Sequence, residues 1–199
     1  MALKSSSESS KASALKAINK QLIMSHAELK KIGMKGTSLR RLTEAGLMHS
    51  LGNGIYSSIS IDPFIAAVLA TAQYYPHAII SGTTALQIHK LGQDYANRID
   101  VDIPRETSVR NQMLKVHRVP KARIIGIQKM KFHHRMIRIY DIERTLCEAY
   151  RISKAGAEFF KALKRYVAMG KINSEKIQKY DLVLKTRVLL HLQQEQADA

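Results

Sequence analysis

Two neighbouring arginines, Arg40 and Arg41, lie in a short stretch with the periodicity of an α-helix. Winding residues 38–45 at about 100° per residue turns Leu39 and Leu42 inward and the two arginines outward. A guanidinium group can hydrogen-bond to guanine in the major groove of DNA or hold a backbone phosphate. These residues therefore indicate recognition of nucleic acid.

Two carboxylates offer a different chemistry. Asp100 and Asp102 alternate with apolar residues on a predicted strand, so both point to one face. Gly82-Thr83 opens a predicted helix after a buried strand, and Asp141 follows a later strand. Nucleotidyltransferases use a glycine turn to hold nucleotide phosphates and a D-x-D pair to hold magnesium. The alternative function is therefore a nucleotidyltransferase-like enzyme that uses these residues with magnesium.

A simpler interpretation of the same carboxylates remains open. Those enzymes carry Gly-Gly or Gly-Ser at the turn, whereas this chain has threonine in second place. Asp100 and Asp102 would then lie on an exposed strand face and pair with Arg98 and Arg105.

The histidines do not form a metal-binding pattern. His133 and His134 are adjacent, so on a strand they face opposite sides, and the other histidines lack ligand spacing with Cys147. Cys147 is expected to be a buried apolar residue, and Arg144 to bond Glu148 one helical turn later. We therefore expect no enzymatic activity under the main interpretation, no metal and no cofactor.

The charge of the chain favours a polyanionic partner. Its 199 residues include 32 Lys and Arg against 16 Asp and Glu, a formal net charge of +16. Residues 1–60 carry +6, residues 61–104 carry −2 and residues 105–199 carry +12. A positive electrostatic field of this size most often attracts nucleic acid. The near-neutral segment between the two basic segments indicates two separate basic surfaces.

Composition also bounds the class of protein and its location. Hydrophobic residues make up 45% of the chain, enough for a packed core. The single cysteine fits a reducing compartment, and the apolar stretch 64–72 is too short to cross a bilayer. The N-terminus lacks the apolar core of a secretory signal. We therefore expect a cytoplasmic protein with no membrane partner.

The first 60 residues have the element order of a winged helix-turn-helix. An apolar stripe over 14–23 predicts a helix, and Ser25 with Glu28 forms a capping box that opens a second one. A glycine turn over 33–36 precedes the helix at 38–45, which Thr37 caps, and residues 47–57 form a β-hairpin. In such a module the third helix enters the major groove and the hairpin follows the backbone or the minor groove. The expected DNA-binding residues are Lys35, Thr37, Ser38, Arg40, Arg41, His49 and Asn53. A protein-interaction module is the competing interpretation.

Beyond Asp62-Pro63, a helix-start signal, the pattern changes to α+β. It predicts a helix from residue 63, strands at 77–81, 99–103, 115–119, 123–132 and 135–140, and helices at 142–151, 156–169 and 174–193. The predicted organisation is a disordered tail over 1–12, a winged helix-turn-helix domain over 13–60 and an α+β domain over 61–193. The fold class is α+β, with a mixed C-terminal domain that ends in helices.

A second basic surface is expected within residues 105–144, where 11 Lys and Arg face 3 Asp and Glu. Its candidate residues are Arg110, Lys115, Arg118, Lys129, Lys131, Arg135 and Arg138. The competing interpretation is a solvated sheet face.

Three segments carry a resemblance to a known family. The stretch H-A-E-L-K-K-I-G-M-K-G-T-S-L-R-R-L-T-E-A-G-L with L-G-N-G-I-Y resembles the winged-helix start of AbiEi antitoxins from abortive-infection toxin–antitoxin systems. A-I-I-S-G-T-T-A-L-Q-I-H-K-L-G and I-R-I-Y-D-I-E-R-T-L-C-E-A-Y resemble two later segments of that family. The match spans about residues 25–180, and the pairing of S-G-x-x-A-L with E-R-T-L is its more distinctive part.

The resemblance implies an antitoxin that represses its own operon by binding inverted repeats in double-stranded promoter DNA. Its second domain would counteract a nucleotidyltransferase-like toxin without needing a stable complex. Thr37, Ser38, Arg40 and Arg41 would be the DNA-reading positions, and residues 52–56 the wing. The family often has arginine before the last glycine of the wing, where this chain has Asn53.

Overall fold

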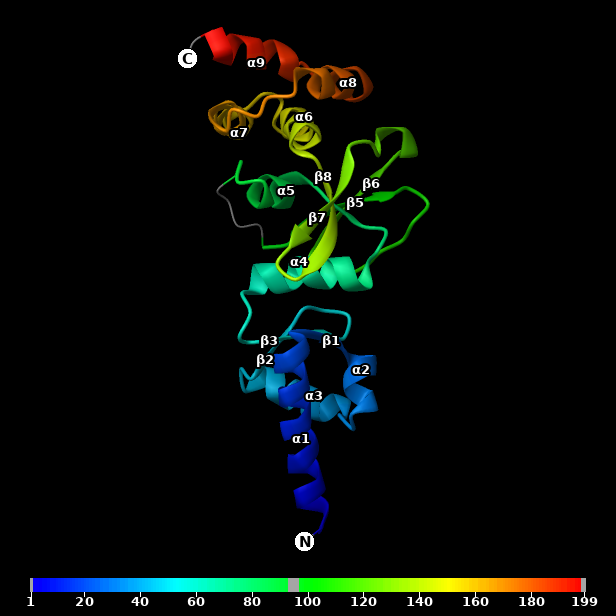
Figure 1. The fold of residues 1–199 in the computed structure, drawn as a ribbon. Coiled ribbons are helices and arrows are strands. Elements are labelled where there is room, and N and C mark those ends of the chain that lie inside the picture. The colour runs from blue at the N-terminus through cyan, green and yellow to red at the C-terminus, as the bar shows by residue number, and fades with distance from the viewer. Residues whose placement is uncertain (1, 93–96, 198–199) are drawn as a thin grey trace. The chain divides into compact units, whose positions relative to one another are not determined.

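The computed structural model describes residues 2–92 and 97–197, which form a mixed α+β protein with two β-sheets (Figure 1). The α+β class predicted from the sequence is confirmed. The chain divides into two compact units. The first holds the chain through Tyr75 together with Asn111–Met113, and the second holds Pro76–Arg110 and the chain from Leu114 onward.

The first unit surrounds a three-stranded antiparallel sheet of order β1-β3-β2. Its elements are α1 (Ala2–Gln21), β1 (Ile23–Ser25), α2 (His26–Lys31), α3 (Gly36–Glu44), β2 (Met48–Ser50), β3 (Ile55–Ser58) and α4 (Pro63–Tyr74). The predicted disordered tail over 1–12 differs from this structure, in which α1 begins at Ala2. The core is made by apolar side chains from α1, α2, α3 and β2, among them Ile18, Leu29, Leu39, Leu42 and Met48.

Local sequence signals set the ends of these helices. The Glu28 amide donates to Ser25 Oγ at 3.2 Å and the Ser25 amide donates to Glu28 Oε2 at 2.6 Å, which is the predicted capping box. The cap of α3 is Lys35 rather than the predicted Thr37, and its side chain makes no capping bond. Gly33, with a φ of 87°, permits the turn between these two helices.

Helix α4 belongs to the first unit, although the sequence predicted a boundary at 60/61. It contacts β1 and β3, and Tyr74 donates its hydroxyl to Glu28 Oε2 at 2.6 Å. Burial raises the pKa of Glu28, but the bonds from Tyr74 and Ser25 outweigh it, so the net pKa lies below its usual value. The units therefore divide after Tyr75, one helix later than predicted.

The second unit is a five-stranded mixed sheet of order β6-β5-β4-β8-β7 with a set of helices (Figure 1). Its strands are β4 (Ile79–Ile80), β5 (Ile99–Pro104), β6 (Leu114–Val119), β7 (Ile127–Phe132) and β8 (Arg135–Tyr140). The β4–β8 and β5–β6 pairs are parallel, and the β4–β5 and β7–β8 pairs are antiparallel. Its helices are α5 (Gly82–Ile88), the 3₁₀ turn η1 (Lys121–Arg123), α6 (Ile142–Ser153), α7 (Ala157–Ala168), α8 (Ser174–Leu184) and α9 (Val188–Ala197).

Two predicted elements of the second unit are divided in the structure. The strand expected over 123–132 begins only at Ile127, because residues before it form η1 and a loop. The helix expected over 174–193 is two helices, separated where Lys185 adopts a left-handed φ of 56°. Asp181 caps the second of them by accepting from the amides of Val188 at 3.1 Å and Leu189 at 2.9 Å.

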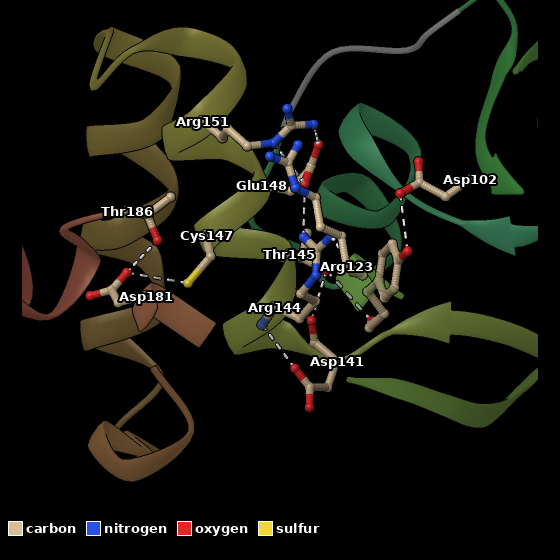
Figure 2. Close-up of polar contacts among 11 residues, drawn as sticks. Asp102, Arg123, Asp141, Arg144, Thr145, Cys147, Glu148, Arg151, Asp181 and Thr186 are labelled. Atoms are coloured by element: carbon tan, nitrogen blue, oxygen red, sulfur yellow. Dashed lines mark hydrogen bonds and ion pairs between the residues drawn. The ribbon is translucent and has the colours of Figure 1, made fainter. Parts of the chain in front are cut away.

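A buried ion pair within α6 lies at the centre of the second unit (Figure 2). Arg144 Nη1 donates to Glu148 Oε2 at 2.8 Å, and the two side chains are only 1% and 5% exposed. This confirms the internal helix pair expected from the sequence. The guanidinium lies 4.3 Å from the centre of the Tyr140 ring, and Nη2 donates to the Arg123 carbonyl at 3.4 Å. Arg151 adds a second donor to Glu148.

The Glu148 carboxylate stays charged inside the protein because two guanidinium groups face it. Burial raises the pKa of Glu148, but the bonds and charges of Arg151 and Arg144 outweigh it and leave the net pKa below its usual value. The pair therefore contributes to stability above the unfolded pKa of about 4.5, and that contribution is lost as the pH falls through the lower folded value.

We expect Glu148→Ala to lower the free energy of unfolding of the second unit by roughly 3 kcal/mol, since it strands a buried guanidinium. Urea denaturation at pH 7 measures this change. Arg151→Ala is the matched control: the Arg151 side chain is 38% exposed, so its loss should cost less than about 1 kcal/mol. An equal loss of unfolding free energy in the two variants would contradict the inference that the buried Arg144–Glu148 pair is the stabilising contact.

Candidate nucleic-acid interface

Helix α3 presents one polar face and one apolar face. Leu39 and Leu42 are buried in the core of the first unit, whereas Thr37, Arg40 and Arg41 are exposed and Ser38 is half-buried. The orientation expected from the helical periodicity is therefore confirmed. The exposed face carries two guanidinium groups and two hydroxyl groups, all of which can donate to phosphate or base atoms.

The two arginines of this face differ in their surroundings. Arg40 Nε donates to Glu44 Oε1 at 2.7 Å across one helical turn, with side chains 81% and 58% exposed. An exposed pair of this kind contributes a few tenths of a kcal/mol and exchanges readily for another partner. Arg41 forms no ion pair with any residue that the structure describes. Both guanidinium groups are thus available to a ligand.

The β2–β3 hairpin follows α3 and ends in a tight turn. Gly52, Asn53 and Gly54 all have left-handed φ angles of 81°, 50° and 68°, a conformation that glycine adopts freely and asparagine tolerates. His49 on β2 and Asn53 at the turn are both exposed. Two positions predicted for DNA contact therefore lie on the surface of this hairpin.

Asn111 supports the turn from a distant part of the chain. A Cβ on Gly52 would lie 2.7 Å from Asn111 Oδ1, so a larger residue here would force the Asn111 side chain to move, and the left-handed φ of 81° also favours glycine. Asn111 Nδ2 donates to the Tyr75 hydroxyl at 2.9 Å and, at 3.5 Å, to the Gly52 carbonyl. Sequence reasoning missed this residue, because no local pattern links position 111 to a turn almost 60 residues earlier.

Lys35 and His26 lie at the starts of α3 and α2. Lys35 is the exposed N-cap residue of α3. The His26 amide donates to the Gly54 carbonyl at 2.6 Å, which ties the hairpin turn to the start of α2. The sequence singled out Lys35 but not His26.

The residues expected to form a second basic surface do not all come together. Strands β6 and β7 are the two edges of the sheet, so Lys115 and Arg118 on β6 lie apart from Lys129 and Lys131 on β7. Arg110 precedes β6 in a loop. The strand order therefore divides the expected surface, which one sequence stretch could not reveal.

A smaller basic patch remains on the β7–β8 hairpin. Lys129 pairs with Arg138 and Lys131 with Met136, so these four side chains share one face. Both lysines are exposed, and Arg138 donates to the Pro76 carbonyl at 2.8 Å. Arg135 pairs with Phe132 and points to the opposite face. We call Lys129, Lys131 and Arg138 the hairpin patch.

Asp100 and Asp102 are buried, each 2% exposed, so the expected exposed strand face is wrong. The strand that carries them, β5, lies between β6 and β4 in the interior of the sheet, and its residues from Ile99 to Ile103 are buried on both faces. Asp100 Oδ2 accepts from the Thr83 amide at 3.2 Å and from the Thr83 hydroxyl, and a Cβ on Gly82 would lie 3.0 Å from the Asp100 carboxyl carbon. Asp102 accepts from the Tyr140 hydroxyl at 3.0 Å. Neither pairs with Arg98 or Arg105 in the part of the chain described.

These contacts bear on the nucleotidyltransferase alternative. The Asp100 carboxylate occupies the start of α5, where a nucleotide phosphate would have to lie. Asp141 instead caps α6 and accepts from Lys176 at 3.1 Å and Tyr180 at 2.7 Å. Within residues 2–92 and 97–197, no three His, Cys, Asp or Glu side chains are grouped as metal ligands.

His117 shares the Asp100 carboxylate. Its Nε2 lies 2.8 Å from Asp100 Oδ1, and Lys115 Nζ lies 3.4 Å from the same oxygen. The bond to Asp100 raises the pKa of His117 above its usual value, against an opposing effect of burial. Burial raises the pKa of Asp100, but His117, Thr83 and Lys115 outweigh it and lower the net pKa.

Comparisons with known proteins identify a shared fold. No protein-family model matches the chain, and no curated protein matches it significantly. The crystal structure of the RV2827C protein from Mycobacterium tuberculosis is similar, with a TM-score of 0.64 and 14% sequence identity over 94% of this chain and 77% of that one. At this identity the likeness concerns the fold alone. None of the described helices has both the length and the apolar character of a membrane span.

We expect the contribution of His117 to stability to depend on pH. Because its folded pKa is raised, the contribution is complete below the unfolded pKa of about 6.5 and falls as the pH rises through the folded value. His117→Asn should therefore destabilise the protein more at pH 5.5 than at pH 8.5, as measured by urea unfolding. In a protein that already carries Asp100→Asn, the loss of stability caused by His117→Asn should be the same at both pH values. A trend that persists there would mean that another group titrates with His117.

Proposed function

We propose that the protein is an antitoxin and an autoregulatory transcriptional repressor of the AbiEi type. Its first unit would bind inverted repeats in promoter DNA as a winged helix-turn-helix, with α3 as the recognition helix and the β2–β3 hairpin as the wing. Its second unit would counteract a nucleotidyltransferase-like toxin. The protein would act in the cytoplasm.

The observation that carries the DNA-binding part is the polar face of α3. Leu39 and Leu42 fix the helix to the core, so Arg40 and Arg41 are presented outward on a rigid element. An α-helix with its side chains is about 10–12 Å across, which suits a major groove about 12 Å wide. The β2–β3 hairpin of the antiparallel sheet follows α3, with His49 and Asn53 exposed on it.

The antitoxin part depends on the resemblance to the AbiEi family. Two of its distinctive segments lie at the start of α5 and in α6, where Gly82 and the E-R-T-L residues 143–146 are all buried. Burial favours a structural role for these segments and leaves the exposed surface of the second unit for the toxin or its target.

We infer no catalytic role for the glycine turn and the two aspartates. Asp100 is engaged by Thr83, His117 and Lys115, and Asp102 by Tyr140. No observed contact favours the nucleotidyltransferase alternative over a structural role for these carboxylates.

We expect the combined change Arg40→Ala and Arg41→Ala to weaken promoter binding by more than tenfold, because two charge-assisted contacts are lost. A gel-shift assay with the DNA upstream of the gene measures this. The fold should be unaffected, since both side chains are exposed. Lys171→Ala with Lys179→Ala is a control that removes the same charge from exposed positions of the second unit. Unchanged binding in the arginine variant would remove α3 from the role of recognition helix.

We expect the hairpin patch to supply phosphate contacts without sequence preference. Lys129→Gln with Lys131→Gln should then lower the slope of log K against log salt by up to about 2, because each phosphate contact releases roughly 0.9 counterions. The measurement is a salt titration of binding by fluorescence anisotropy. A slope equal to that of the unmodified protein would mean that the patch does not contact DNA.

A further inference from the structure

His26 touches both elements of the proposed DNA-binding surface. It is the first residue of α2 and is exposed. Its amide donates to the carbonyl of Gly54, the last residue of the hairpin turn, at 2.6 Å. Its ring lies against Gly36, the first residue of α3: a Cβ there would be 3.8 Å from Cε1 and 3.9 Å from Nε2.

The packing around this residue is close on the side of the hairpin. A Cβ on Gly54 would lie 3.2 Å from the Cβ of His26, tighter than ordinary contact, and Gly54 has a left-handed φ of 68°. Glycine at this position therefore allows the turn to approach α2. The main chain of His26 fixes the hairpin tip, while its side chain extends to α3.

The chemistry of the neighbouring groups is that of a phosphate contact. An imidazole ring donates at least one N–H in either protonation state. Gly36, which the ring approaches, is flanked in the chain by the exposed Lys35, with an ammonium group, and the exposed Thr37, with a hydroxyl. Donors of these kinds from adjacent elements make most of the backbone contacts that position proteins on DNA.

We propose that His26 contacts a DNA phosphate and, through its main chain, sets the position of the hairpin relative to α3. The proposal rests on the proposed DNA-binding function and adds a residue to it. The ligand is the phosphodiester backbone of duplex DNA, at a point between the segment in the major groove and the segment under the hairpin.

The side-chain part is tested with DNA that carries single methylphosphonate substitutions. On unmodified upstream DNA, His26→Ala should bind about fivefold more weakly than the unmodified protein, as expected for one exposed charge-assisted bond. On DNA with a methylphosphonate at the contacted phosphate, His26→Ala and the unmodified protein should bind with equal affinity. His26→Gln keeps an N–H donor and should retain most of the affinity. No loss in His26→Ala, or a loss that persists at every neutralised phosphate, would overturn the contact.

The main-chain part is tested by a second pair of variants. His26 is the first helical residue of α2, and Ser25 before it is extended with φ −81° and ψ 160°, so proline is sterically tolerated. His26→Pro removes the N–H that holds Gly54 as well as the ring, whereas His26→Ala removes the ring alone. We expect His26→Pro to bind at least threefold more weakly than His26→Ala while its circular dichroism spectrum is unchanged. Equal affinities of the two folded variants would overturn the positioning role.

Failure of this inference and failure of the proposed function give different results. If the unmodified protein binds upstream DNA and loses that binding with Arg40→Ala and Arg41→Ala, the DNA-binding function stands whatever His26 does. If the unmodified protein does not bind that DNA, the proposed function itself fails, and the role of His26 fails with it.

Discussion

The second unit depends on one constraint: the guanidinium group of Arg144, whose side chain is 1% exposed, must find its partners among the residues around it. Glu148 lies one helical turn along α6, the Tyr140 ring lies beneath the charge, and the carbonyl of Arg123 accepts a further bond. These partners come from α6, from the end of β8 and from η1. Glu148 would move together with Arg144 if α6 shifted along the sheet, but the Tyr140 ring and the Arg123 carbonyl would not. These two contacts therefore fix the position of the helix more strictly than apolar packing alone would.

The basic residues of the chain divide into two kinds. Arg144 is internal, and Lys115 and Lys176 are held by Asp100 and Asp141. Lys129, Lys131 and Arg41 are exposed to solvent. The count of 32 Lys and Arg therefore overstates the number of cations that a ligand can meet, because some of them pair with carboxylates that the fold has buried. The same division separates residues that hold the structure from those that can bind a ligand.

Features set by short-range geometry could be predicted from the sequence. The Ser25–Glu28 capping box, the inward Leu39 and Leu42 and the Arg144–Glu148 pair all join residues within one helical turn. Features set by the order of strands could not. Burial of Asp100 and Asp102 depends on the interior position of β5 in the sheet, which alternation does not reveal. The approach of Asn111 to Gly52 joins segments far apart in the chain. The division of the basic stretch 105–144 between two sheet edges has the same cause.

Cys147 is the only cysteine of the chain, and it lies fully buried in α6 of the second unit. Burial and the nearby Asp181 carboxylate raise the pKa of its thiol, against the opposing effects of Thr186 and Arg144, so the sulfur is protonated and shielded in the folded state. A thiol reagent can therefore react only when the helices around α6 separate. The rate of its labelling reports the opening of the second unit alone, without any added probe, while the first unit contributes no signal.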